Sequence, residues 1–505
     1  MPWRAGRTLL ARTRITAPKP HSVAQTPRCG AQTMNRRQFC IIQGAPLWIT
    51  LLCGSLQAQA LSLHSGLLNQ DEGAPDLESA EVDDADDWTE ALKHILLDGS
   101  GRHWLDIGGH ARARYESWNN FSFGLGPVDQ SQDDEFLLTR LVVHADYHFH
   151  ERGRAFLEVK SALSTDRDLL GGTRTLDVDD FAVQQAFVDW RLPVADHEVT
   201  IRPGRQSLQF GKQRLVSPLP WGNTLRAWDG LSVRGDIDGW SATAFWTLFA
   251  PVQQHDFNDP DDGTRFWGLY STKQVDSDLE VDMYLLGLER EAVGFNGTVG
   301  DEERYSIGAR LGSNPAPDRL DYDVEATHQF GAVGSGDIDA QMFAVELGYS
   351  TEVGGMPCRF FAGYDFATGD REPGGDVETF NQLFPLGHAY LGFIDAIGRQ
   401  NNESVHAGFG IQLTSHLKFA LAYHSFRLED EADALYTPRG AVTIPGGGTR
   451  ADVGDELDLT LNMALDRHTD LLVGYSRFFA GDVLEESGPG GEDIDFVYLA
   501  LRYGF

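Results

Sequence analysis

Residues 105–116 read LDIGGHARARYE, and polar and apolar residues alternate along them. Arg112 and Arg114 fall on one face of an extended strand, and the alanines and the tyrosine beside them fall on the other. Residues 137–149, LLTRLVVHADYHF, repeat the pattern. A soluble sandwich with an apolar core would give the same alternation. The period therefore predicts strands without choosing between a sandwich and a membrane barrel.

Many such segments follow one another from residue 104 onward, and none is long enough to be a membrane helix. Most span ten residues or more, the length that a tilted strand needs to cross a bilayer. Tight turns alternate with long connections, as in bacterial outer-membrane barrels. The expected strands are 104–118, 135–150, 153–164, 180–193, 197–210, 226–236, 238–250, 264–273, 279–290, 303–313, 319–331, 338–351, 356–368, 403–413, 416–428, 453–465, 469–481 and 495–505.

The last segment, Val497–Phe505, alternates in the same way and ends on phenylalanine. An apolar strand cannot remain an open edge in lipid, so we expect it to pair with the first strand. The terminal aromatic residue resembles the address that is read by the outer-membrane barrel-assembly machinery. The predicted fold is all-β: a closed antiparallel transmembrane β-barrel of about 18 strands, with short periplasmic turns, long extracellular loops and an aqueous lumen.

Residues 1–60 are expected to be an over-extended start followed by a secretory signal peptide. A charged region at 34–37 precedes a mostly apolar stretch, and Ala-Gln-Ala at 58–60 is a cleavage site. Three of the four cysteines lie in this segment, so the mature chain would keep only Cys358 and no intramolecular disulfide is expected.

Residues 61–103 are predicted to be an acidic periplasmic leader. Trp88, Leu92 and Ile95 recur at helical spacing, which predicts one short helix. The formal net charge of the whole chain is −34 at pH 7, which argues against nucleic-acid binding through a basic face.

Two stretches combine cations and aromatic rings, the groups that hold carboxylates and sugars. They are 204–229, GRQSLQFGKQRLVSPLPWGNTLRAWD, and 380–401, FNQLFPLGHAYLGFIDAIGRQN. Both resemble signatures of the alginate export family, outer-membrane barrels that pass an anionic polysaccharide. The resemblance spans most of the expected mature chain.

Charged residues opposite the apolar face are expected to line the lumen, because charges facing lipid are costly. Arginine or lysine rings lower the entry cost for anions. Strict alternation turns Arg205 toward lipid, so Arg205 can line the lumen only if a bulge at Pro203–Gly204 rotates it inward. The alternative for each cation is a structural ion pair. The predicted substrate conduit comprises Arg112, Arg114, Arg140, Lys160, Arg202, Arg205, Arg214, Arg226, Arg234, Arg310, Arg359 and Arg502.

Residues 369–402 are predicted to form a long loop that folds into the barrel, because apolar residues such as Leu383 and Phe384 would be badly placed in water. An ordinary packed external loop is the alternative. The resemblance implies a periplasmic gate on a late turn, but the corresponding turn at 466–469 is short. Either the gate is absent or the leader replaces it. The expected constriction residues are His388, Tyr390, Asp395, Arg399 and Gln400.

The predicted function is export of alginate or a similar uronate polymer through a bacterial outer-membrane porin. The alternative is an uptake porin for small anionic or neutral saccharides, and a structural or adhesive barrel fits the inward cations less well. No nucleophile elbow, zinc motif or phosphate-binding loop is present, so neither an enzyme, a metal site nor a cofactor is expected. The expected partners are a saccharide or polysaccharide substrate, the lipid bilayer, the barrel-assembly machinery and periplasmic export partners, and no nucleic acid.

Overall fold

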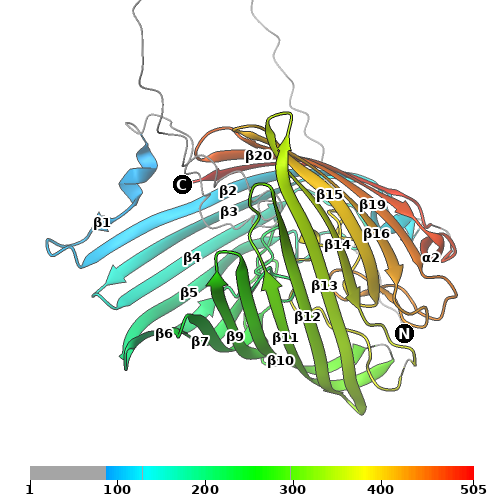
Figure 1. Cartoon of the computed structure of the whole chain (residues 1–505), viewed down its shortest axis with the longest axis horizontal. Coiled ribbons are helices and arrows are strands. Elements are labelled where there is room, and N and C mark those ends of the chain that lie inside the picture. Colours follow the sequence, from blue (N-terminus) through cyan, green and yellow to red (C-terminus); the bar gives the residue numbers. More distant parts are fainter. Residues whose placement is uncertain (1–86, 128, 296, 373, 489) are drawn as a thin grey trace, which may run out of the picture. The chain divides into compact units, whose positions relative to one another are not determined.

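The computed structural model describes residues 87–505 except 128, 296, 373 and 489. The predicted start, the signal peptide and the leader up to residue 86 lie outside the described residues. Nineteen described strands form one antiparallel sheet, and eighteen of them close into a barrel because β2 pairs with both β3 and β21 (Figure 1). The prediction of a closed barrel of about 18 strands is confirmed.

The strand bounds agree closely with the alternation. The barrel strands are β2 (His103–Asn119), β3 (Asp134–Phe149), β4 (Gly153–Ser164), β5 (Asp179–Val194), β6 (His197–Gln206), β7 (Ala227–Ile237), β8 (Trp240–Ala250), β9 (Thr264–Asp276), β10 (Leu279–Phe295), β11 (Thr298–Gly312), β12 (Arg319–Val333), β13 (Gly336–Val353), β14 (Met356–Ala367), β15 (Asn402–Thr414), β16 (Leu417–Leu428), β19 (Asp452–Ala464), β20 (Thr469–Ala480) and β21 (Ile494–Gly504). Shorter elements in the connections are η3 (Phe121–Gly124), η4 (Gly387–Ala389), β17 (Leu435–Tyr436), β18 (Val442–Ile444) and α2 (Asp482–Glu485).

The largest error in the strand bounds concerns β10 and β11. We expected a loop between residues 290 and 303, but the two strands continue as a hairpin to Phe295 and Thr298. The pairing register shifts between Arg290 and Val293. Such an irregularity moves the later residues onto the other face, so the apolar pattern no longer continues in phase.

The described part of the leader is less helical than predicted. A single 3₁₀ turn, η2 (Trp88–Leu92), is capped by Asp87, whose carboxylate accepts a hydrogen bond from the Thr89 amide at 2.9 Å. β1 (Ile95–Leu96) is a strand that pairs with the beginning of β2 (Figure 1). β21 ends near Gly109, so the start of β2 would otherwise present unpaired backbone groups.

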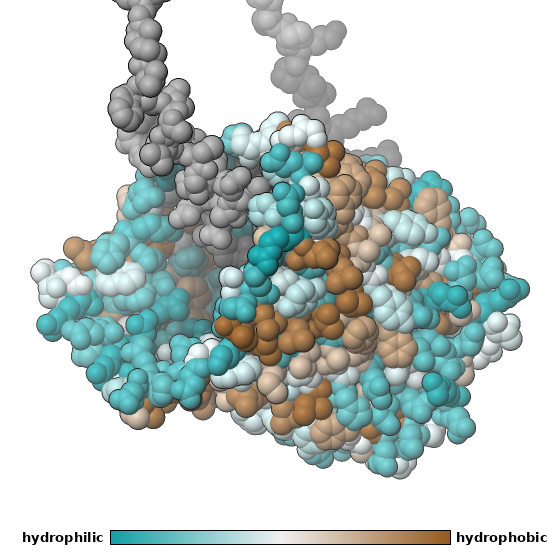
Figure 2. Space-filling view, viewed as in Figure 1, coloured by the Kyte–Doolittle hydropathy of each residue, from teal (hydrophilic) through white to brown (hydrophobic). Residues whose placement is uncertain are grey.

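The barrel wall is apolar outside and charged inside. Leu347 and Met283 are 56% and 54% exposed, whereas Arg140 and Lys160 are 2% and 1% exposed. The visible face carries a broad hydrophobic patch bordered by hydrophilic residues (Figure 2). A soluble sandwich would bury the apolar face, so this distribution excludes that alternative. Within residues 87–505, leaving aside the four undescribed positions, no helix has the length and apolar character needed to cross a membrane.

Two long connections fold inward. The first inserted loop (residues 207–226) joins β6 to β7, and the second inserted loop (residues 368–401) joins β14 to β15. Val216 and Phe380 are buried with rings of β7–β9, whereas Ile394 and Ile397 are buried with rings of β2, β16 and β20. The apolar residues of these loops therefore pack against the inner face of the wall, while the outer face of the wall remains free for lipid.

Candidate substrate conduit

The two inserted loops contact each other directly. Val216 and Phe384 form a parallel β-bridge, in which the Ser217 amide donates to the Phe384 carbonyl at 2.9 Å. The Phe384 amide donates to the Leu215 carbonyl, also at 2.9 Å. Farther along, the Trp221 ring stacks on His388 with centroids 3.8 Å apart. The two stretches that suggested the family in the sequence therefore form one unit inside the barrel.

One end of the first inserted loop is held by arginines of β2 and β3. Arg112 donates to the Pro220 and Gly222 carbonyls at 3.1 and 2.6 Å, and Arg140 donates to the same two oxygens at 3.2 and 2.7 Å. Arg114 donates to the Trp221 carbonyl at 2.6 Å and lies over the Trp221 ring. These conduit arginines therefore bind neutral peptide groups of the loop, and Arg114 also forms an ion pair with Glu116 at 2.7 Å.

The other end is held across the lumen. Arg214 forms ion pairs with Asp323 at 2.5 Å and Glu325 at 3.1 Å, both on β12. Counted around the closed sheet, β12 lies ten strands from β2 in one direction and eight in the other. The first inserted loop therefore spans the lumen. Burial opposes the charge on Arg214, but these carboxylates outweigh it and raise the pKa of the guanidinium.

Arg226 holds the two loops together where the first one returns to the wall. Its guanidinium donates to the Pro385 carbonyl at 2.8 Å and to the Ser217 carbonyl at 3.2 Å. Burial, followed by repulsion from Arg439, lowers the Arg226 pKa to about 9. Neutral carbonyls are weaker partners than carboxylates, so burial prevails here, whereas it does not at Arg214.

The second inserted loop is tied to several strands. Arg399 pairs with Asp365 of β14, and the Tyr390 hydroxyl donates to the Lys212 carbonyl. His388 lies 3.0 Å from Asp395 within the loop. Gln400 is buried and faces Gly440, which lies in the loop 429–451 between β16 and β19. All five predicted constriction residues thus lie in this inserted loop, although Gln400 points toward the loop above it.

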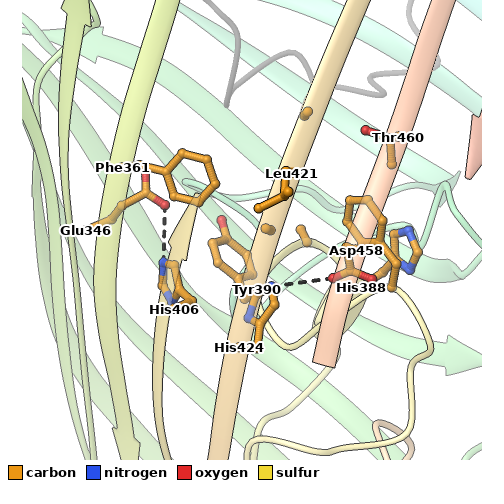
Figure 3. A pocket seen from close by; sticks show the side chains of 13 residues that line it. Glu346, Phe361, His388, Tyr390, His406, Leu421, His424, Asp458 and Thr460 are labelled. Carbon is orange, nitrogen blue, oxygen red and sulfur yellow. Dashed lines mark ion pairs between the residues drawn. The ribbon is translucent and has the colours of Figure 1, made fainter. Parts of the chain in front are cut away.

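A small cavity lies between the second inserted loop and the wall (Figure 3). Tyr390, Phe361 and Leu421 line it, and the pairs Glu346–His406 (3.5 Å) and His424–Asp458 (3.6 Å) flank it. Its volume is about 30 Å³, which is room for roughly two water molecules. No sugar ring fits this space as the loop stands.

A larger polar cavity lies nearer the periplasmic turns. Its volume is about 200 Å³, and Arg202 and Arg234 line it together with Arg154 and Arg191. Arg202 makes a two-pronged pair with Asp189 at 2.6 and 2.7 Å. Arg154 also pairs with Asp146 at 2.7 Å and Arg191 lies 3.8 Å from Glu198, so carboxylates offset part of the positive charge around this cavity.

The remaining conduit predictions are three ion-paired residues, one arginine beside Arg112, and Arg205 on the outer face. The ion-pair alternative describes Lys160 (Asp179, 3.0 Å), Arg310 (Glu280 and Asp282, 2.8 Å each; Asp323, 2.6 Å) and Arg359 (Asp321; Glu346, 2.8 Å). Arg502 faces the lumen directly opposite Arg112.

The bulge expected at Pro203–Gly204 is absent, because β6 keeps one register with β5 and with β7. Arg205 therefore stays on the outer face near the extracellular rim, where Asp229, directly opposite, binds its guanidinium at 2.6 and 2.8 Å. This ion pair makes the outward position of Arg205 acceptable without a bulge.

Several inward charged residues were missed in the sequence. Arg304 binds Glu302 at 2.6 Å, and Asp365 receives Arg399. Arg304 and Arg310 lie an even number of residues apart on β11 and therefore point to the same face, so the alternation in the sequence already indicated that Arg304 points inward. Among the described residues, no group of three His, Cys, Asp or Glu side chains is arranged to hold a metal ion.

Comparison with known proteins agrees with this architecture. The family model described as alginate export matches residues 103–496. Among curated protein sequences, none matches the chain. Similar solved structures, all from Pseudomonas aeruginosa, include OccD3 (OpdP; 12% identity, 79% of this chain and 91% of that chain, TM-score 0.54), OprD (13%, 79% and 93%, 0.53) and OpdQ (12%, 79% and 97%, 0.53). At these identities the structures show the fold alone. The chain belongs to the alginate export family and is an outer-membrane β-barrel of the porin type.

Proposed function

We propose that the barrel passes uronate-containing saccharides across the outer membrane passively, and that the main transported species is an exported polyuronate such as alginate. The observation that carries this proposal is the group of lumenal arginines on β21, β2 and β3, namely Arg502, Arg112, Arg114 and Arg140. Arg112 and Arg140 donate to the Pro220 and Gly222 carbonyls, and these neutral acceptors add no negative charge to the lumen.

The chemistry follows from the geometry of the guanidinium group. Its planar donors match the two oxygens of a carboxylate and replace the water that the carboxylate loses on entering the lumen. The 200 Å³ cavity, which Arg202 and Arg234 line, offers a second group of guanidinium donors on the periplasmic side. A uronate chain carries one carboxylate per sugar, so successive sugars would exchange between such positions without any covalent step.

Uptake of small saccharides is the second candidate, and the meeting of the two inserted loops favours it. The Val216–Phe384 bridge joins the two loops inside the barrel, and the cavity between the second inserted loop and the wall is only about 30 Å³. A small solute needs a smaller displacement of the loops than a polymer does.

Flux from liposomes tests the proposal and separates the two candidates. We expect labelled oligouronates to leave protein-containing liposomes faster than neutral oligosaccharides of the same length. Rates that persist for long uronate chains support export, whereas a steep fall beyond two or three sugars supports uptake. Equal rates for uronate and neutral sugars would contradict selective passage of uronates.

A further inference from the structure

Three arginines lie side by side on the lumenal face of adjacent strands. Arg140 of β3 is directly opposite Arg112 of β2, and Arg112 is directly opposite Arg502 of β21. Like charges in directly opposite positions destabilise a sheet. This arginine row places two such pairs in succession. Asp470 of β20 lies directly opposite Arg502 and offsets charge at that end, and Arg112 and Arg140 also require electron-rich partners.

The turn Pro220–Gly222 supplies two of these partners. The Pro220 and Gly222 carbonyl oxygens each accept hydrogen bonds from both Arg112 and Arg140, at 2.6–3.2 Å. Two oxygens shared between two guanidinium groups resemble the arrangement that one carboxylate would make. The turn thus occupies the place of an anion without bringing a negative charge.

We propose that the Pro220–Gly222 turn is a latch that a substrate carboxylate opens. A uronate carboxylate binds Arg112 and Arg140 in place of the two carbonyl oxygens, because its negative charge and its two coplanar oxygens match a guanidinium group better than neutral carbonyls do. Displacement of the turn then separates the inserted loops. This inference rests on the proposed function, because it requires uronates to enter the lumen.

The contacts around the turn define what moves. Trp221 stacks on His388, so movement of the turn breaks a contact with the second inserted loop. Asn223 stays fixed, because its side-chain amide donates to the backbone carbonyls of Thr139, Leu163 and Asp177 at 2.8–3.2 Å. The latch therefore pivots at Asn223, and uronate binding couples to release of the Val216–Phe384 bridge.

Hydrogen exchange on the intact protein tests the latch without any variant. We expect a uronate trisaccharide to speed amide exchange in residues 216–222 at least tenfold, and maltotriose to leave it unchanged. If uronates cross the barrel and exchange in 216–222 does not change, the latch is refuted while the proposed function stands. If uronates neither cross nor change exchange, both are refuted.

Two variants give independent readouts. Arg112→Gln combined with Arg140→Gln should raise exchange in 216–222 without ligand and abolish the response to uronate, whereas Arg319→Gln on a periplasmic turn should keep the response. Val216→Cys combined with Phe384→Cys places two cysteines at bridge positions, where neighbouring strands lie about 5 Å apart and a disulfide can form. Oxidation should abolish uronate-induced conductance and reductant should restore it. A response that survives oxidation would overturn the latch.

Discussion

Replacing Arg214 with alanine should undock the first inserted loop while leaving the barrel closed. Arg214 is the only residue of this loop, within the described part of the chain, for which ion pairs to the β12 wall are seen. Its side chain is 3% exposed and also lies over the Tyr390 ring at 4.5 Å. The substitution removes both contacts and leaves Asp323 and Glu325 in place.

The size of the effect follows from the partners that remain. Removing one member of a buried ion pair costs about 3–5 kcal/mol. Asp323 retains Arg310 at 2.6 Å and Glu325 retains the Tyr284 hydroxyl at 2.9 Å, so neither carboxylate is abandoned. We therefore expect the lower end, about 3 kcal/mol, which corresponds to an increase of roughly 100-fold in the undocked population.

Hydrogen exchange measures that population directly. Amides in residues 207–226 should exchange about two orders of magnitude faster in Arg214→Ala, following the free-energy change. The barrel strands should keep their protection, because their backbone amides are held in the ladders between neighbouring strands. Arg319→Ala is the matched control, since Arg319 pairs with Asp278 on an exposed turn. Exchange in 207–226 within threefold of the wild-type rate would refute the view that this ion pair docks the loop.

Three further predictions concern the wall, an external loop and the leader. Leu347→Arg places a charge on the lipid-facing surface and should destabilise the barrel by about 2–4 kcal/mol if the site lies near the bilayer midplane. Glu352→Arg, beside a periplasmic turn, should not destabilise it. Equal unfolding free energies for the two variants in vesicles would contradict the assignment of faces. Burial opposes ionisation of Asp177, but the ion pair with Arg174 outweighs it and holds the Asp177 pKa below its ordinary value, so its stabilising effect is complete above that value and is lost as pH falls through the lowered pKa. Protection of residues 165–178 against exchange, taken relative to the intrinsic exchange rate at each pH, should therefore fall in acid. In Asp177→Asn this protection should be low at neutral pH and depend little on acid; an unchanged acid response in that variant would count against this pairing. Arg467 pairs with Asp87 and with Glu90 at 3.2 Å. Arg467→Ala should therefore expose residues 87–97 to protease while the barrel keeps its heat-dependent gel mobility. Unchanged cleavage would show that other contacts hold the leader.

The barrel could be predicted from the sequence because each strand carries its own signal. In β13 the burial alternates from residue to residue, as lipid outside and charged groups inside require. The alternation gave wrong predictions at two places. Beyond Arg290 the pairing register shifts, so the later residues change face. At Arg205 we expected a bulge to turn the side chain inward, but the register is unbroken there. The position of a residue in the alternation predicts which face of the sheet its side chain is on. The ion-pair partner of an arginine depends instead on the neighbouring strands.

The candidate site was less predictable because its contacts join distant segments. The sequence indicated that both signature stretches matter and placed the second one inside the barrel. It did not indicate that Val216 forms a β-bridge with Phe384. It also did not indicate that the backbone carbonyls of Pro220 and Gly222 accept hydrogen bonds from Arg112 and Arg140. A backbone oxygen carries no residue-type signal, so this kind of partner is invisible to motif reasoning.

The leader shows the same limit. Trp88, Leu92 and Ile95 recur at helical spacing, yet the edge of β2 captures Ile95 as a strand residue. Asp87 and Glu90 bind Arg467 of the short late turn, which is the turn where a gate was considered.

Ion selectivity of single channels in a planar bilayer tests the central claim most directly, because it reports the charge that a permeating ion meets in the lumen. With a salt gradient across the membrane, the account predicts a reversal potential of the sign for anion preference, and a current that changes when oligouronates are added but not when neutral oligosaccharides are. A reversal potential showing cation preference, together with no response to oligouronates, would contradict it.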